Sequence, residues 1–332
     1  MRCLCCNKEM TNSKEYERSV QWHERCIRRF FGASTLPEID ISEEALVQLA
    51  NQSVNQGLTV PGVQKKLSLQ FEKSGKRLRL TLVGYPTGYI LKPQSKEYAC
   101  LPEAEFLTMK MAEIAGIKTV PNALLFFQGT YAYITKRIDR EKKQAYAMED
   151  FCQLSGRMTE DKYRSSYESC GNVIQKFSQK VGLDKAEFFY RLLFCFVTCN
   201  SDMHLKNFSL IEDRPGSRKF SLSAAYDMLP VNVIMPADKE QTALTLNGKK
   251  RNLRKKDFLK LAGSLGIPEK VALGLMKQIV KYKECFAEEI KASYVSDDFK
   301  ERFLLEMQKR MEIFEGTVIP EESAENGMIQ GI

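Results

Sequence analysis

The sequence predicts an α+β protein in which a small, sheet-rich lobe is followed by a larger, mostly helical lobe. Three observations carry this prediction. Residues 67–71 and 77–83 alternate between apolar and polar side chains, as half-buried strands do. Residues 185–200 are apolar nearly all round, which is typical of a helix buried inside a sizeable domain. With 332 residues, the chain is long enough for about two domains.

The small lobe is predicted to be an antiparallel sheet over residues 58 to 140, with one helix inserted. Period-two alternation with intervening turns indicates the strands, and a helical apolar period closed by Gly116 indicates the inserted amphipathic helix. The predicted elements are a helix over 39–55, a hairpin from 67–71 and 77–83, a strand over 88–92 ending at Pro93, the helix over 102–117, and a hairpin over 122–138 that turns at Gln128–Gly129.

The remainder is predicted to be mostly helical. Its elements are helices over 149–156, 166–181 and 185–200, a short hairpin from 208–213 and 219–227, and helices from Lys255 to Phe314. The last residues are polar and are expected to be disordered. The predicted division of the chain is a metal-binding segment (1–35), the small lobe (36–145), the helical lobe (146–316) and the tail (317–332).

Composition narrows the class of protein. The longest apolar run, Leu192–Val197, is far too short to cross a bilayer, and the N-terminus has no apolar signal core, so a cytoplasmic protein is expected. Ten cysteines in a chain of this length are interpreted as reduced, mostly buried thiols. The net charge is +8, and its densest cluster, residues 248–257, is interpreted as a solvated loop leading into a helix, because few aromatic residues are interleaved for base stacking.

The first 32 residues hold four of the ten cysteines, the only tryptophan and one of the two histidines. Cys3-x-x-Cys6 and His23-x-x-Cys26 have the spacing of two zinc-knuckle pairs, which could converge on one tetrahedral zinc ion. A segment this short has little core of its own and would gain stability from the metal. Cys5 is then a spare thiol. The alternative is a reduced cysteine cluster without metal.

A polar cluster follows the apolar helix. Asp202 and Asn207 form a D-x-x-x-x-N pattern, the spacing of the protein-kinase catalytic loop, in which the Asp accepts the hydroxyl proton and the Asn holds Mg²⁺. The predicted hairpin after the loop ends at Asp227, which could return a second carboxylate to the metal. Lys92 lies on a small-lobe strand, where kinases place the lysine that contacts the nucleotide phosphates. Glu105, preferred over Glu103, is the candidate to orient it.

The segment from Gly57 to Gln64 is the candidate phosphate-binding loop. It has the glycine spacing of a Walker A motif, but the Lys and Ser/Thr of that motif are absent and a strand follows instead of a helix. Its backbone amides could still cradle phosphates. The candidate residues are Thr59, Gly62, Val63 and Gln64, with Lys65 and Lys66 as neighbouring cations.

Seven blocks in order resemble the HipA-like serine/threonine kinases, the toxins of bacterial toxin–antitoxin modules: "GVQKKLSL", "YILKP", "LPEAEFLTMKMAEIAGI", "KRIDR", "EDFCQ", "NSDMHLKNFSL" and "YDMLPVN". The resemblance covers residues 40 to 316. It implies a two-lobed, protein-kinase-like fold that uses ATP and Mg²⁺. It also implies that Asp202 is the catalytic base, that Asn207 and Asp227 are metal ligands, that Lys92 contacts the phosphates, and that His204 lines the nucleotide site. For His204, the alternative is a buried structural histidine.

The resemblance further implies a protein substrate such as an aminoacyl-tRNA synthetase, growth arrest and persistence, and a small DNA-binding antitoxin (HipB-like) as partner. Direct DNA binding by this chain itself is not expected, since no helix-turn-helix pattern is evident. Two departures stand out: the short cysteine-rich segment replaces the N-terminal subdomain of longer members, and Thr59 stands near the position of their autophosphorylated serine. The alternatives are a small-molecule kinase on the same fold and a non-catalytic, pseudokinase-like scaffold.

Overall fold

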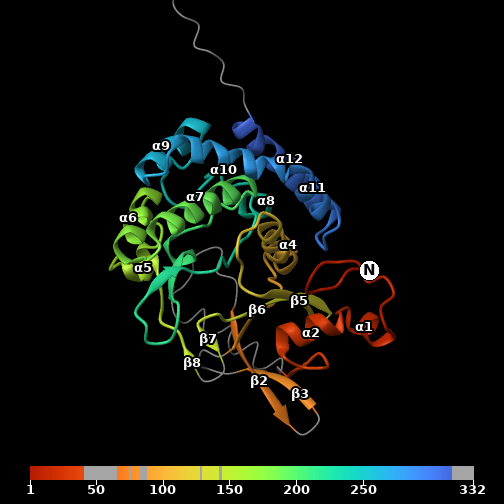
Figure 1. The fold of residues 1–332 in the computed structure, drawn as a ribbon. Helices are drawn as coiled ribbons and strands as arrows, with labels where there is room; N and C mark the ends of the chain where they lie inside the picture. The colour runs from red at the N-terminus through yellow and green to blue at the C-terminus, as the bar shows by residue number, and fades with distance from the viewer. Residues whose placement is uncertain (41–65, 75–76, 83–87, 128, 142–143, 316–332) are drawn as a thin grey trace, which may run out of the picture.

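The structure is a computed structural model that describes residues 1–40, 66–74, 77–82, 88–127, 129–141 and 144–315. Figure 1 shows a small lobe built on a sheet and a larger lobe of helices, with the red N-terminal segment packed against the side of the sheet. The predicted α+β architecture with two lobes is confirmed. The tail over 317–332 lies outside the described residues.

The small lobe contains a six-stranded sheet in the order β1-β3-β2-β4-β6-β5. Its strands are β1 (Glu38–Asp40), β2 (Leu67–Ser74), β3 (Arg77–Leu82), β4 (Tyr89–Lys92), β5 (Asn122–Phe127) and β6 (Thr130–Lys136). Neighbouring strands are antiparallel, as predicted, except for the parallel pair β1–β3. Gly129 takes a positive φ of 78° in the β5–β6 turn, a conformation that glycine adopts without strain.

One predicted element is wrong at its start. The predicted helix over 39–55 includes residues 39 and 40, but these pair with Leu80 and Thr81 as part of strand β1. The rest of that range lies outside the described residues. The apolar residue Ile39 packs on the core of the sheet, and this tertiary contact outweighs the local helical pattern.

The inserted helix is α4 (Leu101–Ile114), and it ends before Gly116, whose φ is 81°. The predicted amphipathic character is wrong, because every residue from 101 to 112 except Glu103 is buried. The helix packs against β5 and β6 on one side and against α11 (Lys283–Lys291) of the larger lobe on another. It therefore lies at the junction between the two lobes (Figure 1).

The larger lobe is built around α7 (Val181–Val197), which is buried from Phe188 onward, as predicted. The other helices are α5 (Phe151–Leu154), α6 (Tyr167–Phe177), α8 (Val231–Ile234), α9 (Lys255–Ser264), α10 (Glu269–Lys281), α11 (Lys283–Lys291) and α12 (Asp297–Glu315), with short 3-10 helices η1 (Thr159–Asp161) and η2 (Leu205–Asn207). The predicted helix over 166–181 ends at Phe177, because Ser178 is extended and its hydroxyl donates to Asp184 at 2.6 Å.

Two small sheets complete the fold of the described residues. The predicted short hairpin is present as β10 (Ser209–Glu212) and β11 (Phe220–Leu222), and β9 (Met148–Asp150) adds a third, antiparallel strand to it. The second sheet is the pair β7 (Arg140–Glu141) and β8 (Gln144–Ala145). Because β9 leads directly into α5 and β10 follows the polar loop after α7, this three-stranded sheet holds that loop in place.

The N-terminal segment contains α1 (Glu15–Val20) and α2 (Glu24–Phe31) and shares a core with the sheet. Trp22 is fully buried and its ring lies 5.7 Å from that of Phe30 and 5.6 Å from that of Phe31. Both phenylalanines contact Tyr89 of β4. By itself this segment has little core, as expected. Its aromatic residues are buried instead against the small lobe, with which the segment shares a core.

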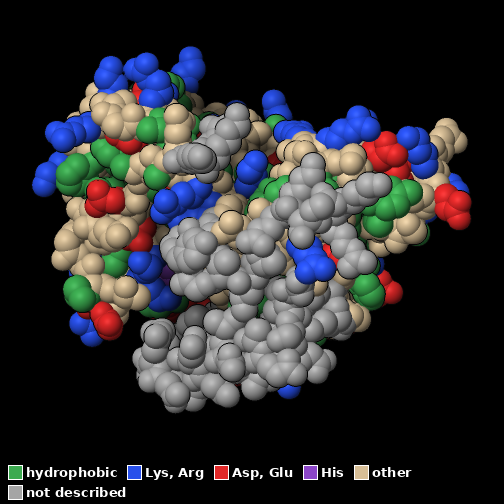
Figure 2. Space-filling view, turned by 90° about the horizontal axis from the view of Figure 1, so that it is seen from below, with side chains coloured by type: hydrophobic (Ala, Val, Ile, Leu, Met, Phe, Trp, Pro, Cys, Tyr) green, Lys and Arg blue, Asp and Glu red, His purple; other side chains and the backbone are tan. Residues whose placement is uncertain are grey.

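The surface charges are distributed. On the face seen from below in Figure 2, lysine and arginine side chains lie at several separate places among the described residues. In the basic cluster over 248–257, Lys249 pairs with Asp257 at 2.9 Å and Lys250 with Glu240 at 3.2 Å, and α9 begins at Lys255. This agrees with a loop leading into a helix.

All ten cysteines are free. In the described part of the chain no helix is both long and apolar enough for a membrane span.

Candidate active site

The polar loop between α7 and β10 is held rigid by hydrogen bonds within it. Asn207 donates through Nδ2 to the backbone carbonyl of Asp202 at 2.8 Å, and the Asp202 amide donates to Asn200 Oδ1 at 3.1 Å. Tyr167, buried in α6, donates its hydroxyl to the carbonyl of Met203 at 3.1 Å. The backbone is therefore fixed at both ends of the D-x-x-x-x-N pattern, which places the Asp202 and Asn207 side chains reproducibly.

Within the described part of the chain, the Asp202 carboxylate has one hydrogen-bond partner. Tyr163, which follows η1, donates its hydroxyl to Asp202 Oδ1 at 2.6 Å. Burial raises the pKa of Asp202 above its usual range, while the Tyr163 hydrogen bond and Lys162 act in the opposite direction. A carboxylate with a raised pKa is a better proton acceptor, which suits a general base. Nothing in the sequence pattern had pointed to Tyr163.

A second group of charges is assembled around Lys92, at the end of β4. Its Nζ lies 2.5 Å from Glu105 Oε1 in α4 and also contacts Asp227 Oδ1. Burial alone would lower the pKa of Lys92, but the two carboxylates raise it above its usual value, so the lysine is a cation. Burial raises the pKa of Glu105 to about 7, with Lys92 opposing the rise. Glu103 does not contact Lys92, and burial raises the pKa of its carboxyl as well.

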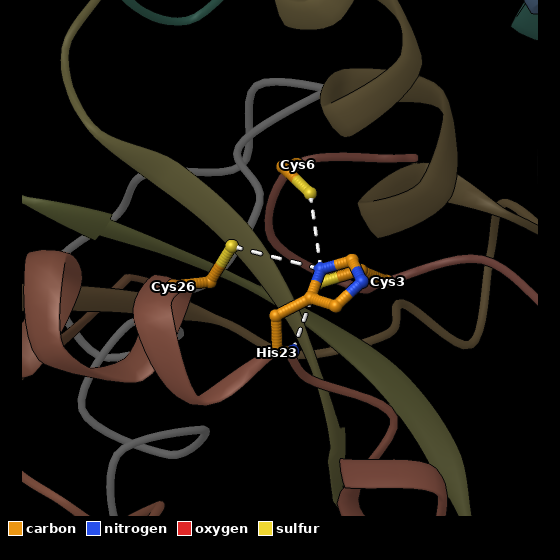
Figure 3. Close-up of side chains that lie close together, drawn as sticks. All are labelled: Cys3, Cys6, His23 and Cys26. Carbon is orange, nitrogen blue, oxygen red and sulfur yellow. Dashed lines mark hydrogen bonds between the residues drawn. The ribbon is translucent and has the colours of Figure 1, made fainter. Parts of the chain in front are cut away.

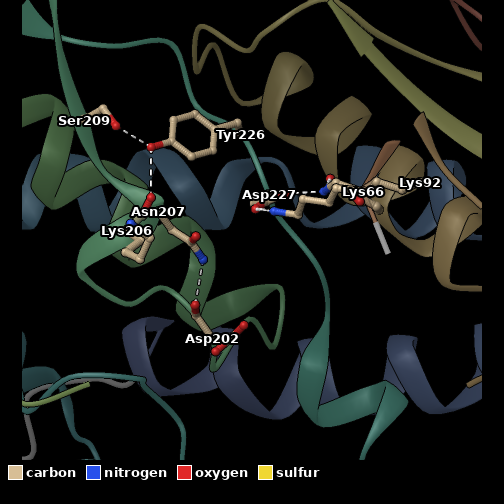
Figure 4. A network of polar contacts seen from close by, with 9 residues as sticks. Lys66, Lys92, Asp202, Lys206, Asn207, Ser209, Tyr226 and Asp227 are labelled. Atoms are coloured by element: carbon tan, nitrogen blue, oxygen red, sulfur yellow. Dashed lines mark hydrogen bonds and ion pairs between the residues drawn. The ribbon is translucent and has the colours of Figure 1, made fainter. Parts of the chain in front are cut away.

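Asp227 is held by two lysines at once, as Figure 4 shows. Lys66, one residue before β2, contacts Asp227 Oδ2 at 2.6 Å, while Lys92 contacts the other oxygen. Burial would raise the pKa of Asp227, but the two cations more than offset it and hold that pKa well below its usual range. Asp227 also has a φ of 56°, in the left-handed region that non-glycine residues seldom occupy. Such an outlier is typical of functional sites.

Tyr226 links Asp227 to the polar loop. Its hydroxyl donates to the carbonyl of Lys206 at 3.0 Å and accepts from Ser209 Oγ at 2.5 Å (Figure 4). Lys206 in turn pairs with Asp150, at the end of β9, at 2.7 Å. Segments far apart in the sequence, from β9, η2, β10 and the residues before α8, are thereby held in one arrangement.

Two cavities flank this arrangement. One, of about 340 Å³, is lined by Lys66, Lys92, Asn207 and Asp227 together with the apolar side chains Ile90, Val120 and Met148. The other, of about 390 Å³, is lined by Asp202 and Tyr163 and by side chains such as Tyr98, Ile234 and Met235. The hydrogen bond from Asn207 to Asp202 joins the walls of the two cavities. Both volumes suit small-molecule or side-chain ligands.

The first cavity fits a magnesium nucleotide by the chemistry of its lining. The cations Lys66 and Lys92 match polyphosphate oxygens, and the Asp227 carboxylate and Asn207 amide oxygen are ligands that Mg²⁺ prefers. The apolar residues Ile90 and Val120 offer a surface for a planar base. The sequence pattern had not indicated these apolar residues, because their spacing along the chain carries no common signal.

His204 does not line either cavity. It is buried, and its ring packs edge-on against that of Tyr163 at a centroid distance of 5.0 Å. Burial, together with Lys162, lowers the pKa of His204 to about 3, so the ring is neutral. Its Nδ1 has no hydrogen-bond partner among the described residues. That His204 lines a nucleotide site therefore stays a prediction; in the structure its ring packs against Tyr163 beside the polar loop.

The remaining predicted site residues fall into two groups. Thr59, Gly62, Val63, Gln64 and Lys65 of the candidate phosphate loop lie outside the described residues. The four predicted zinc ligands, Cys3, Cys6, His23 and Cys26, come together in one cluster, with all four ligand atoms within 4.8 Å of one another.

The chain matches known proteins over most of its length. Residues 58–285 match the family model "HipA-like C-terminal domain". A protein of Sinorhizobium fredii named "Putative kinase Y4dM" is 31% identical over 257 residues, which is 72% of this chain and 61% of that protein. A "Putative kinase" of Haemophilus influenzae is 29% identical over 211 residues, 59% of this chain and 59% of that protein. The chain thus spans about three fifths of the length of these curated relatives.

Solved structures agree on the fold. A chain of the Shewanella oneidensis MR-1 complex of HipA, HipB and operator DNA superposes with a TM-score of 0.65 at 20% identity, covering 85% of this chain and 76% of that one. The Helicobacter pylori proinflammatory kinase CtkA superposes with a TM-score of 0.54 at 15% identity, covering 75% of this chain and 94% of that one. The fold is therefore the two-lobed fold of these proteins. Since the family match over residues 58–285 takes in more than half of the sequence, the chain belongs to the HipA-like C-terminal domain family.

Proposed function

We propose that the protein is an ATP-dependent kinase that phosphorylates a serine or threonine hydroxyl of another protein. One observation supports this most strongly: Lys92 joins Glu105 and Asp227 in the cavity that also contains Asn207, while Asn207 is hydrogen-bonded to the segment bearing Asp202. A phosphate-binding cation, two metal ligands and a base thus converge, as phosphoryl transfer requires. A scaffold without activity would have no need of the set.

Each residue has a distinct role in the proposed reaction. Asp202 accepts the proton of the attacking hydroxyl, aided by its raised pKa. Lys92 and Lys66 contact the phosphates, and this requires them to give up contacts that they now make with Asp227. Asn207 and Asp227 would hold Mg²⁺, which supplies positive charge against the developing negative charge of the phosphoryl group. Glu105 keeps Lys92 in place.

The acceptor side supports a protein substrate. The cavity that contains Asp202 is also lined by apolar side chains, among them Leu229, Ile234 and Met235, and by the acidic residues Glu97 and Asp238. A side chain carrying a hydroxyl can enter there while its flanking residues contact the lining. The alternatives are a small-molecule hydroxyl in the same cavity and a pseudokinase-like scaffold without transfer activity.

The biological setting is proposed from the family. An aminoacyl-tRNA synthetase is the proposed target, and growth arrest and persistence are the proposed consequences of phosphorylating it. The Shewanella oneidensis relative is described with HipB and operator DNA. We accordingly propose a HipB-like antitoxin as partner and the cytoplasm as location.

The test compares wild type with Asp202→Asn, using labelled Mg-ATP and a bacterial lysate. The variant is expected to lose transfer by about 10²-fold or more, since it lacks the general base, and to bind nucleotide with nearly unchanged affinity. Asp297→Asn is the matched control, because the Asp297 side chain is 92% exposed and lies at the start of α12. Retained transfer in Asp202→Asn would refute the assignment. Mass spectrometry of the labelled lysate distinguishes protein from small-molecule products.

A further inference from the structure

The cysteine–histidine cluster of the N-terminal segment plays no part in the proposed phosphoryl transfer. Figure 3 shows the side chains of Cys3, Cys6, His23 and Cys26 pointing toward a common centre. His23 Nδ1 lies 3.5 Å from Cys6 Sγ and 4.0 Å from Cys26 Sγ. Ligand atoms around a tetrahedral zinc ion are separated by about 3.5–3.8 Å, given Zn–S and Zn–N bonds of about 2.3 and 2.0 Å. The two His23 distances are close to this spacing, and all four ligand atoms lie within 4.8 Å of one another.

The local backbone is shaped to present these side chains. The Asn7 amide donates to the Cys3 carbonyl and the Cys3 amide to the Lys8 carbonyl, both at 2.9 Å, which closes a tight turn with Asn7 at a φ of 54°. His23 is the N-cap residue of α2, and Cys26 lies in its first turn. The amide of His23 donates to Cys3 Sγ at 3.4 Å, and an amide directed at sulfur favours the thiolate form that binds metal.

The four donor atoms of the cluster suit zinc. Three sulfur ligands and one imidazole nitrogen are typical of structural zinc sites, in which protein side chains fill all four positions. Cys5 is the neighbour of a ligand, but it is not part of the cluster. Because Cys5 lies in the same turn, it provides a control with the same chemistry and the same sequence context.

The turn that carries Cys3 and Cys6 contacts both lobes. On the small-lobe side, the carbonyl of Leu4 accepts a hydrogen bond from the amide of Leu124 at 2.8 Å. Leu124 lies in β5, the last strand of the sheet, so this bond uses the outer edge of the strand. On the other side, the Tyr294 hydroxyl, just after α11, donates to the Arg2 carbonyl at 2.6 Å, and Asn7 Nδ2 donates to Glu289 Oε1 at 2.5 Å.

We propose that Cys3, Cys6, His23 and Cys26 bind one structural zinc ion, and that the zinc-bound turn clamps the edge of the small-lobe sheet to the end of α11. The metal fixes the turn, and the turn holds the two lobes at one separation. The rest of the segment does not depend on the metal for its place, because Trp22, Phe30 and Phe31 are buried against the sheet. Loss of zinc therefore loosens the clamp without unfolding the chain. This inference is independent of the proposed kinase activity.

The metal is tested by elemental analysis of the full-length protein purified without added zinc. Wild type and Cys5→Ser are expected to contain about one zinc per chain, and Cys6→Ser and His23→Ala to contain little. In cobalt-substituted wild type, the visible absorption of tetrahedral thiolate-bound Co²⁺ is expected. Absence of metal from wild type, or equal zinc in Cys6→Ser and Cys5→Ser, would overturn the zinc site. Metal content does not depend on catalysis, so this outcome leaves the proposed function standing.

The clamp is tested by hydrogen exchange on wild type with its zinc removed by a chelator and then restored. The amide of Leu124 and the amides of residues 283–294 are expected to exchange faster by about tenfold or more without zinc, while the amides of the central strand β4 are unchanged. Restoring zinc should reverse the effect. Unchanged exchange at both places after complete zinc loss would refute the clamp, and faster exchange throughout β4 would show that the metal maintains the whole fold instead.

Discussion

Replacing Lys92 with methionine is expected to make the stability of the protein depend on pH above about 7 more strongly than that of wild type. Methionine retains the apolar stem of the lysine and removes its charge, so the buried Glu105 loses its cation. Asp227 keeps Lys66 as a partner at 2.6 Å and stays ionised. Glu105 responds by taking up a proton, because an unpaired carboxylate is costly to bury.

The expected magnitude comes from proton linkage. In wild type, burial raises the pKa of Glu105 to about 7. Protonated Glu105 therefore contributes fully to stability below the pKa that Glu105 has in the unfolded chain, and this contribution is lost as pH rises through about 7. Without Lys92 that loss continues to higher pH, since buried glutamates without a cation reach pKa values of about 8–9. Each pH unit over which Glu105 stays protonated in the folded variant adds about 1.4 kcal/mol, so from pH 7 to pH 8.5 the variant loses roughly 1–1.5 kcal/mol more than wild type.

Urea unfolding at about pH 7 and about pH 8.5 measures this difference. The matched control is the double variant Lys92→Met/Glu105→Gln, which has no carboxyl group to titrate and should show a wild-type-like dependence above pH 7. If the unfolding free energies of the single and double variants change equally between the two pH values, Lys92 does not keep Glu105 ionised. The ion pair on which the candidate site depends would then be refuted.

Two further outcomes are expected. Gly171→Ala in α6 should destabilise the protein by about 1–3 kcal/mol, because the added Cβ would overlap the buried Leu265 side chain. Gly182→Ala, which has open space around the added Cβ, should be neutral or stabilising. Chemical unfolding of both variants measures this difference in stability. Tyr163→Phe removes a hydrogen bond that lowers the pKa of Asp202. The acid limb of the pH–rate profile should therefore move to higher pH, while nucleotide affinity stays unchanged. An acid limb that does not move would contradict the role given to Asp202.

The strands and the main buried helix could be predicted because their signals are local. Alternation over residues 67–71 predicts β2 without knowledge of its partners, and the apolar surface of α7 is evident from its own residues. Strand β1 could not be predicted in the same way. It has three residues, Glu38–Asp40, and becomes a strand only because β3, some forty residues later, offers a free edge.

For the candidate site, the sequence could name individual residues such as Lys92 and Asp227, but it could predict contacts only between residues that lie close along the chain. Asp202 and Asn207 are five positions apart, so their relation could be seen in the chain. Lys66 and Asp227 are 161 positions apart, and Tyr163 and Asp202 are 39 apart. Such contacts depend on how the lobes are assembled, and a short stretch of sequence carries no information about that assembly.

The burial of α4 bears on how such a protein can be switched off. In protein kinases, activity is often controlled by the position of the helix that carries the glutamate partner of the lysine. Here that helix is enclosed by β5, β6 and α11, and Glu105 itself is fully buried. Swinging it outward would expose most of its apolar side chains to water, at about 25 cal/mol for each Å² uncovered. We therefore expect the Lys92–Glu105 pair to stay engaged, and an inactive state of the proposed kinase to arise elsewhere, by blocking nucleotide entry or by covering the cavity that contains Asp202.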